Sequence, residues 1–241
     1  PATGTVTSGT ATVEGSFTIT NGASAAGGLS ADKVAVTDTD GAEVKVEDWS
    51  KQTLDSSNKL NITLKGGELT TTFDDKASKD LTVTLGKVEG AGTISMTTTK
   101  GAEGKAYGQA LTVDTLALSE GDLNFSASGT GAKTGAISIT TAEAGDITLG
   151  TDEVKPDGSS VPTTAAKAAN ITVNDVALAV TLTATKANFD YNAGTVTNAG
   201  TLTLAATKDG DNTGVVTLDK DVSFANSGTV AIKGDKVQFD A

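Results

Sequence analysis

The residues best suited to chemistry in this chain are acidic side chains in short polar turns. Asp38, Asp40 and Glu43 have the spacing of half a calcium-binding loop. Ca²⁺ prefers six to eight oxygen ligands, and such a turn supplies some of them. A complete twelve-residue loop ends on Glu, but the residue at that position, counted from Asp38, is Trp49. Asp-Gly sequences are also ordinary hairpin turns. We therefore expect no cofactor and keep calcium at Asp38, Asp40 and Glu43 as the alternative.

A second acidic group, Asp152, Glu153 and Asp157, could in principle act on a glycosidic bond. That chemistry needs two carboxyl groups roughly 5–10 Å apart in a cleft. Pro156 and Pro162 interrupt this stretch, which indicates a loop. The chain also has no His, Cys or Arg. It therefore lacks thiolate nucleophiles, imidazole bases, the usual zinc and haem ligands, and the bidentate clamp for anions. We predict that the protein is not an enzyme.

The composition restricts the partners and the location. A net charge of −12 repels nucleic acid and anionic membranes. No apolar run reaches the ~20 residues of a membrane-spanning helix, so we expect no membrane insertion. The 42 Thr residues, with 28 Gly and 3 Pro, favour pleated strands joined by turns. A chain rich in Thr, Gly and Ala without Cys is typical of exported bacterial proteins, which predicts an extracellular place at the cell surface.

Short segments that alternate apolar and polar residues recur along the whole chain. Examples are Leu81, Val83 and Leu85, and then Ile137 and Ile139. This period of two predicts strands with one apolar face, and hence an all-β protein. Helical patterns are short and lie at 46–56 and 163–169.

The sequence also has a longer repeat than the strand pattern. In each unit a glycine, or Asn174, precedes two alternating apolar residues. The intervals are close to 27 residues, which predicts an elongated β-solenoid (a parallel β-helix) forming one domain over 1–241. The loop rich in Pro, Gly and Ser allows a subdivision into 1–160 and 161–241. Tandem β-sandwich domains are the alternative, favoured by a hairpin-like pattern at 34–46. The repeat is marked by Gly15, Gly41, Gly67, Gly92, Gly121, Gly145, Asn174, Gly200 and Gly228. The expected buried residues are Leu123, Phe125, Ile147, Leu149, Leu202, Leu204, Val230 and Ile232.

Two stretches near the C-terminus carry a family resemblance: Gly194-Thr195-Val196-Thr197-Asn198-Ala199-Gly200-Thr201-Leu202-Thr203-Leu204 and Asn226-Ser227-Gly228-Thr229-Val230-Ala231-Ile232. They resemble coils of the parallel β-helices in filamentous-haemagglutinin-like adhesins and autotransporter passengers. In composition alone the chain is similar to bacterial surface-layer proteins and flagellin outer domains. The first resemblance covers about residues 170–234 and implies a structural or adhesive role.

The sequence thus predicts a non-catalytic, self-associating subunit of a bacterial surface layer, filament or adhesin shaft, whose partners are copies of itself. An adhesin module that binds a host receptor or glycan is the alternative. The ends of a strand stack keep unpaired backbone groups. Residues 3–13 carry no charge, and Val237 and Phe239 alternate with Gln238 at the other end. We expect one of these segments to add a strand to a neighbouring subunit, head to tail.

Overall fold

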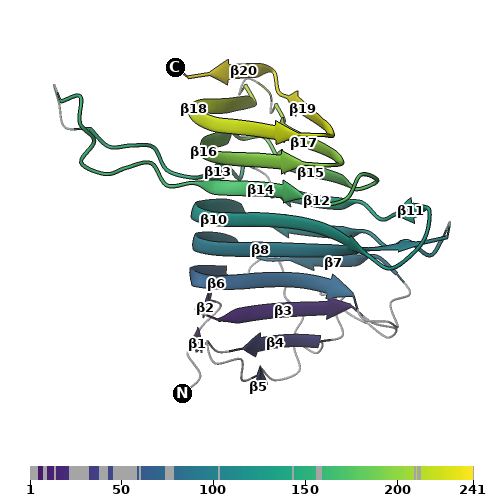
Figure 1. Ribbon diagram of the computed structural model, residues 1–241. Coiled ribbons are helices and arrows are strands. Elements are labelled where there is room, and N and C mark those ends of the chain that lie inside the picture. The colour runs from purple at the N-terminus through teal and green to yellow at the C-terminus, as the bar shows by residue number, and fades with distance from the viewer. Residues whose placement is uncertain are drawn as a thin grey trace.

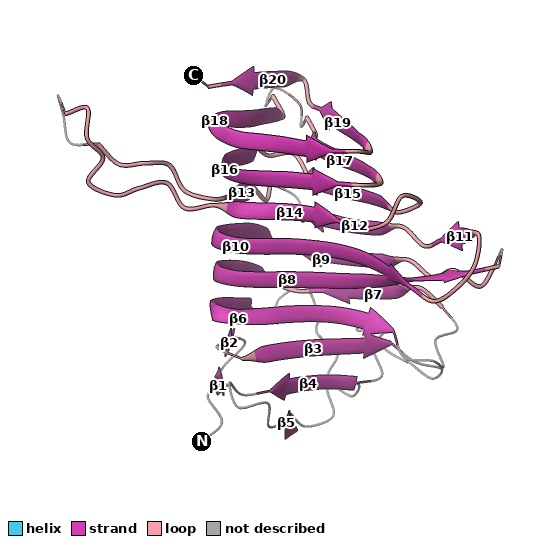
Figure 2. Ribbon diagram, viewed as in Figure 1, coloured by secondary structure: helices cyan, strands magenta, loops and turns pink. Residues whose placement is uncertain are grey.

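The computed structural model describes residues 5–7, 10–13, 15–21, 33–37, 43–45, 59, 61–73, 79–102, 104–142, 144–155, 159–208, 210 and 213–240. Strands account for 68% of these residues, and none of the described segments is helical (Figure 2). The all-β prediction is confirmed. The strands form two sheets. Within each sheet the strands follow one another along one axis, from the N-terminal strands at one end to the C-terminal strands at the other (Figure 1).

The larger sheet contains the long strands and lies on one side of the stack. Most pairs of neighbouring strands within it are parallel. Its strands among the described residues are β1 (Thr5–Thr7), β2 (Thr10–Val13), β3 (Ser16–Asn21), β4 (Lys33–Thr37), β5 (Glu43–Lys45), β6 (Asn61–Phe73), β8 (Lys87–Gly101), β10 (Thr115–Ser128), β11 (Lys133–Thr134), β13 (Ile147–Leu149), β14 (Ala169–Val173), β16 (Phe189–Asn198), β18 (Val215–Asn226) and β20 (Lys236–Phe239).

The smaller sheet is wholly parallel. Its six strands are β7 (Leu81–Thr84), β9 (Gln109–Val113), β12 (Ile137–Thr141), β15 (Ala179–Ala184), β17 (Thr201–Ala206) and β19 (Thr229–Lys233). From β6 onward the chain passes alternately through the two sheets, and each pass pairs with the pass before it. This is the connectivity expected of a β-solenoid, and we call the stacked sheets the shaft. Tandem sandwiches would instead be built from antiparallel pairs.

The first coils of the shaft are close to the predicted repeat in length, whereas later intervals range from 21 residues (Val216 to Val237) to 42 (Ile147 to Phe189, across a long insertion). Ile62, Val88 and Leu116 face one another on β6, β8 and β10, and their numbers differ by 26 and 28. In the smaller sheet, residues 83, 111 and 139 are each 28 apart. Side chains at equivalent positions therefore stack in columns along the axis.

The long strands bend at a register shift, which gives every coil two stretches in the larger sheet. The shift falls between Leu118 and Glu120 where β10 pairs with β8, and between Tyr191 and Ala193 where β16 pairs with β18. Gly121 lies at this bend with φ +126°, and a Cβ there would stand 1.9 Å from the carbonyl oxygen of Gly92 in the coil below. Only glycine fits so close an approach, which explains Gly92 and Gly121 at this place; Ala169 takes the aligned position on β14.

The predicted glycine register holds for the first coils and then changes stretch. Gly15, Gly67, Gly92 and Gly121 all precede the second stretch of a long strand. Gly145 precedes β13, which aligns with first stretches, whereas Gly200 and Gly228 precede β17 and β19 in the smaller sheet. The single register was therefore wrong from Gly145 onward. The reason is that all three stretches of a coil begin after a turn and share the same glycine signature. Gly41 lies outside the described residues.

The core lies between the two sheets and is built from the alternating apolar residues. Leu123, Phe125, Ile147, Leu149, Leu202 and Leu204 are all buried, as predicted. Val230 and Ile232 are only partly buried, so that part of the prediction was wrong. They lie on β19, the outermost described strand of the smaller sheet.

Two other local predictions were also wrong. Residues 163–169 are not helical: they run extended, with Thr164 opposite Val154 and Lys167 opposite Thr151. Asn174 begins a turn rather than a strand, and Val176 is 82% exposed. The helical pattern at 46–56 lies outside the described residues.

A long excursion leaves the shaft between β13 and β14. Residues 150–155 and 159–168 form this arm, which projects to one side of the shaft (Figure 1). The suggested boundary at 160/161 falls within the arm. Both sheets continue past it, because β12 pairs with β15 and β13 pairs with β16.

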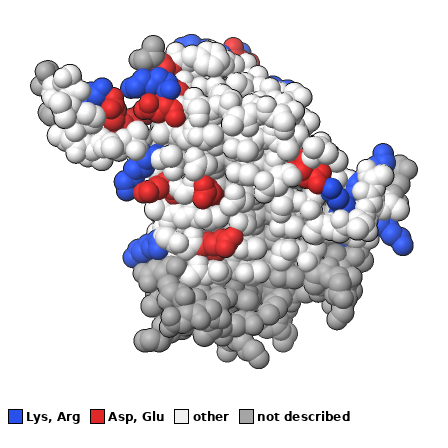
Figure 3. Space-filling view, in the orientation of Figure 1, with Lys and Arg blue, Asp and Glu red and all other residues white. Residues whose placement is uncertain are grey.

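Outward side chains on the long strands form polar ladders. The hydroxyl oxygens of Thr97 and Ser126 lie 3.0 Å apart and form a hydrogen bond, as do those of Thr195 and Ser223. Asn170 Nδ2 donates to Asp122 Oδ1 at 2.9 Å. The broad front of the shaft consequently shows few charged groups, most of which lie near its edges (Figure 3).

Candidate functional site

The acidic residues singled out by the sequence do not assemble into a described metal centre. Asp38 and Asp40 lie outside the described residues, and Glu43 is placed only as the first residue of β5, opposite Thr37. Within the described part of the chain, no group of three or more acidic side chains could hold a metal ion. Asp157 also lies outside it, which leaves Asp152 and Glu153 for comparison.

Glu153 is held in its ionised form by lysines. It forms ion pairs with Lys155 and, at 3.3 Å, with Lys220. The hydrogen bond from Lys155 is the main cause that lowers the pKa of Glu153, and Lys220 adds to it. A general acid needs a raised pKa, so this environment suits a structural link between the arm and β18 rather than proton donation.

Other carboxylates gather where the arm meets the shaft. Desolvation raises the pKa of Asp152, and the Asp219 carboxylate raises it further. Desolvation likewise raises the pKa of Asp190, against a hydrogen bond with Thr217 that lowers it, and Asp146 adds repulsion. These groups make a negative strip on the outside of the shaft, and the strip destabilises the fold at neutral pH.

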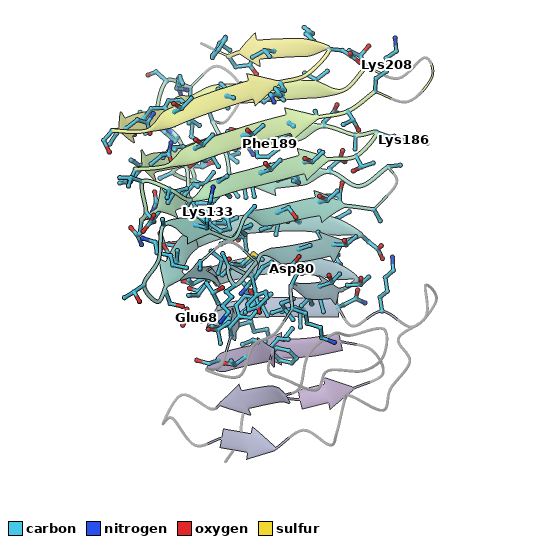
Figure 4. All side chains as sticks on the ribbon, turned by 90° about the vertical axis from the view of Figure 1, so that its right-hand side faces the viewer. Glu68, Asp80, Lys133, Lys186, Phe189 and Lys208 are labelled. Carbon is cyan, nitrogen blue, oxygen red and sulfur yellow. The ribbon has the colours of Figure 1, made fainter. Side chains whose placement is uncertain are left out.

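Tyr107 and Tyr191 do not form a binding face on the shaft. Tyr191 is buried, its hydroxyl donates to the Ala169 carbonyl at 2.8 Å, and burial raises its pKa. Tyr107 packs against Phe73 with ring centroids 6.3 Å apart. Trp49 lies outside the described residues. Figure 4 shows Lys186 and Lys208 at one edge of the shaft, away from the interior where Phe189 lies.

The exposed apolar side chains that continue the core lie at the C-terminal end of the shaft. Phe189, Val216 and Val237 occupy one column, and the first two are fully buried while Val237 is 37% exposed. In the next column Leu218 is buried but Phe239, above it, is 69% exposed. Phe224 stands above the buried Val196 and is 42% exposed. We call β18, β19 and β20 the C-terminal coil.

At the same end, the turn between the two sheets lacks the side-chain hydrogen bonds that join such turns in the coil before it, among the described residues. Asn198 is buried, and its Nδ2 donates to the carbonyls of Gly200 (3.2 Å) and Thr229 (2.9 Å), the latter in the next coil. Its Oδ1 accepts from Gly200 N–H at 3.1 Å. Asn226 occupies the equivalent position one coil later, but it is exposed and makes no such bond to any described residue. The Asn-x-Gly motif thus binds successive coils, and no described coil pairs with its last copy.

The outermost strand of the C-terminal coil presents an unpaired backbone edge. The N–H of Lys236 donates to Gly214 (3.4 Å) and that of Asp240 to Leu218 (3.0 Å). In a strand, the backbone groups of successive residues point to opposite sides. The N–H and C=O groups of Val237 and Phe239 therefore point away from β18, into solvent.

The N-terminal end of the shaft is different. β2 pairs with β6 in parallel, and β1 folds back on β2. β3 is followed at the edge by β4 and then β5, both antiparallel, which places the predicted hairpin of 34–46 against the end of the shaft. Within the uncharged run at 3–13, the described residues 5–7 and 10–13 have strand partners in their own chain, and β5 is the outermost described strand at this end, as β20 is at the other.

Sequence reasoning identified Val237 and Phe239 as terminal strand residues but could not show that the core columns end exposed there. The signal was present in the Asn-x-Gly repeat, whose last copy precedes the last strand of the smaller sheet. Comparison with protein-family models, curated proteins and solved structures finds no match to this chain. Among the described residues, no helix is long and apolar enough to cross a membrane.

Proposed function

We propose that the protein is a non-catalytic structural protein of the bacterial cell surface, a rigid shaft that associates with further copies of itself. One observation carries this proposal. The columns of the core run through every described coil from β6 onward and end exposed at Val237 and Phe239. Apolar side chains and unpaired backbone edges at one place favour the addition of another strand.

The regular stack supports a mechanical role. Parallel strands pair coil on coil, apolar columns fill the interior, and polar ladders cover the outside. Such a structure resists bending without needing a ligand or a cofactor. Each coil binds mainly its neighbours, as in other repeat proteins. A surface layer, a filament or an adhesin shaft would each use a part of this kind.

An adhesin module is the second candidate, and the arm favours it. Val154 and Val161 are exposed on the arm, away from the core of the shaft. Apolar side chains on a projecting hairpin are suited to contact with another molecule. Replacing both by Ser should abolish binding to a host receptor or glycan in an array if the arm is the binding part.

Sedimentation velocity over a wide range of concentration tests the structural proposal. We expect the wild-type chain to associate reversibly and Phe239→Asp to stay monomeric. Val176→Asp is the matched control, because Val176 is also exposed but lies in the turn between β14 and β15, two coils before the C-terminal coil. A wild-type chain that remains monomeric at all concentrations would contradict the proposal, and glycan binding by that monomer would favour the adhesin module.

A further inference from the structure

The strand β20 is complementary to itself. Its sequence with the next residue is Lys236-Val237-Gln238-Phe239-Asp240, with a cation at one end, an anion at the other and apolar residues on either side of Gln238. We infer that two copies of the chain join tail to tail by antiparallel pairing of their β20 strands, centred on Gln238. This inference rests on the proposed self-association and names the surface that makes it.

The backbone geometry allows this register. In an antiparallel pair, residues alternate between positions that exchange two hydrogen bonds and positions that exchange none. Pairing centred on Gln238 places Val237 opposite Phe239 of the second copy. These are the residues whose N–H and C=O groups point away from β18, so they form the bonded positions. Gln238, whose backbone groups face β18, meets its own copy at a non-bonded position.

The side chains fit the same register. Lys236 comes to lie opposite Asp240 of the second copy, twice per dimer because of the two-fold symmetry. Within one chain Lys236 Nζ donates to Gln238 Oε1 and Gln238 Nε2 donates to Asp240 Oδ1, both at 2.7 Å, so the outer row is already ordered. Opposite charges facing each other across strands stabilise the pair, and like charges destabilise it.

The inner row completes the core. Val237 and Phe239 extend the columns of Val216 and Leu218, and pairing would cover them with Phe239 and Val237 of the second copy. The strand is short, so the contact lies below the roughly 1,200–2,000 Å² of a stable interface. We therefore expect a dimer that dissociates on dilution.

A single introduced cysteine tests the register, since the chain has no native thiol. Non-bonded antiparallel positions lie ~4.5 Å apart between Cα atoms, within the separation that a disulfide spans. Gln238→Cys should therefore form a covalent dimer on mild oxidation. Thr201→Cys, exposed on the outside of β17, is the control and should remain monomeric under the same conditions.

Exchange of the two charges gives a test that does not depend on oxidation. Lys236→Glu or Asp240→Lys alone places like charges together twice per dimer and should weaken association about tenfold. The double variant Lys236→Glu/Asp240→Lys should recover the wild-type dissociation constant to within about twofold. Each variant lies on the exposed strand, and its circular dichroism spectrum reports whether it has folded.

The outcomes separate this inference from the proposed function. A wild-type chain that never associates overturns both. Association that persists without rescue by the double variant and without the Gln238→Cys dimer overturns the tail-to-tail pairing, while self-association stands. Rescue together with the disulfide establishes the pairing.

Discussion

The coil of β16 and β17 and the C-terminal coil of β18, β19 and β20 are built on one pattern but differ in exposure. Phe189, Tyr191 and Val196 are buried in the first. The residues of the C-terminal coil that continue the core columns, such as Phe224 and Phe239, are exposed. Equivalent side chains thus differ in burial because the structure describes a coil on each side of the first coil and on only one side of the second. In a stacked fold, the surface that stabilises one coil against the next is also a surface that can bind another molecule.

The largest effect should come from paired substitutions in one column of the smaller sheet. Leu202 is fully buried, and Val230 faces it from the last coil, where it is half-buried. Leu202→Ala should lower the free energy of unfolding by ~2–5 kcal/mol. Val230→Ala should lower it by less than about 1 kcal/mol, because part of its surface is already in water. Chemical denaturation measures both. Equal losses would show that the C-terminal coil is covered in solution.

A glycine at the bend tests how tightly interior coils approach each other. Gly121→Ala must place a Cβ against the Gly92 carbonyl at a φ of +126°, and we expect a loss of ~2–4 kcal/mol. Gly66 also has a positive φ, +80°, but open space around it, so Gly66→Ala should cost ~1–2 kcal/mol. Thermal unfolding compares the two variants. A similar melting temperature for both would mean that the coils are further apart than described.

The two asparagines of the Asn-x-Gly motif give a smaller contrast. Asn198→Ala removes bonds to Gly200 and Thr229 from a buried site and should cost ~1–3 kcal/mol. Asn226→Ala should be within about 0.5 kcal/mol of the wild type in the dilute monomer. Denaturant midpoints at low protein concentration decide the matter, and a costly Asn226→Ala would point to an additional contact at the C-terminal coil.

The smallest effect concerns the negative strip and depends on pH. The folded-state pKa of Asp190 lies above its ordinary value, so the folded chain binds a proton more readily than the unfolded chain. Stability at this site therefore falls as the pH rises from the ordinary pKa near 3.8 through the raised one. Asp190→Asn removes the penalty and should raise the melting temperature at pH 7 by about 1–3 °C. The gain should vanish below the ordinary pKa. A stabilisation independent of pH would indicate another cause.

Much of the fold could be predicted from local patterns. The alternation around Leu123, Ile147 and Leu202 defines strand faces, and the period of two does not depend on which sheet a strand joins. The repeat length of the first coils could be predicted as well, whereas the arm lengthens one coil and the last interval is shorter. The hairpin pattern at 34–46 was also read correctly as antiparallel strands, although it lies at the end of a solenoid.

The rest depends on contacts between coils, which no local pattern records. The glycine signature is the same at all three stretches of a coil, so it could not show that Gly145 and Gly200 lie on different sides. The apparent helix at 163–169 belongs to the arm, where pairing with residues 151 and 154 determines the conformation. Val230 and Ile232 have the pattern of core residues, but among the described strands β19 is paired on one side only, which leaves them half-covered.

The candidate site was only partly visible in the sequence. Val237 and Phe239 could be recognised as a terminal strand, but their exposure follows from the pairing of β18 with β20. The calcium candidates Asp38, Asp40 and Glu43 remain a hypothesis, since Asp38 and Asp40 lie outside the described residues. Heating with and without millimolar calcium would show a rise in melting temperature if they bind the ion.

Residue-resolved hydrogen exchange of β20 at low and high protein concentration tests the central claim most directly. In the dilute chain, the amides of Val237 and Phe239 should exchange rapidly, while that of Asp240, bonded to Leu218, is protected. At high concentration the first two should become protected as well, and the interior strand β17 should be unchanged. Val237 and Phe239 amides that exchange equally fast at both concentrations, or that are already protected when dilute, would contradict an open C-terminal coil completed by a second copy.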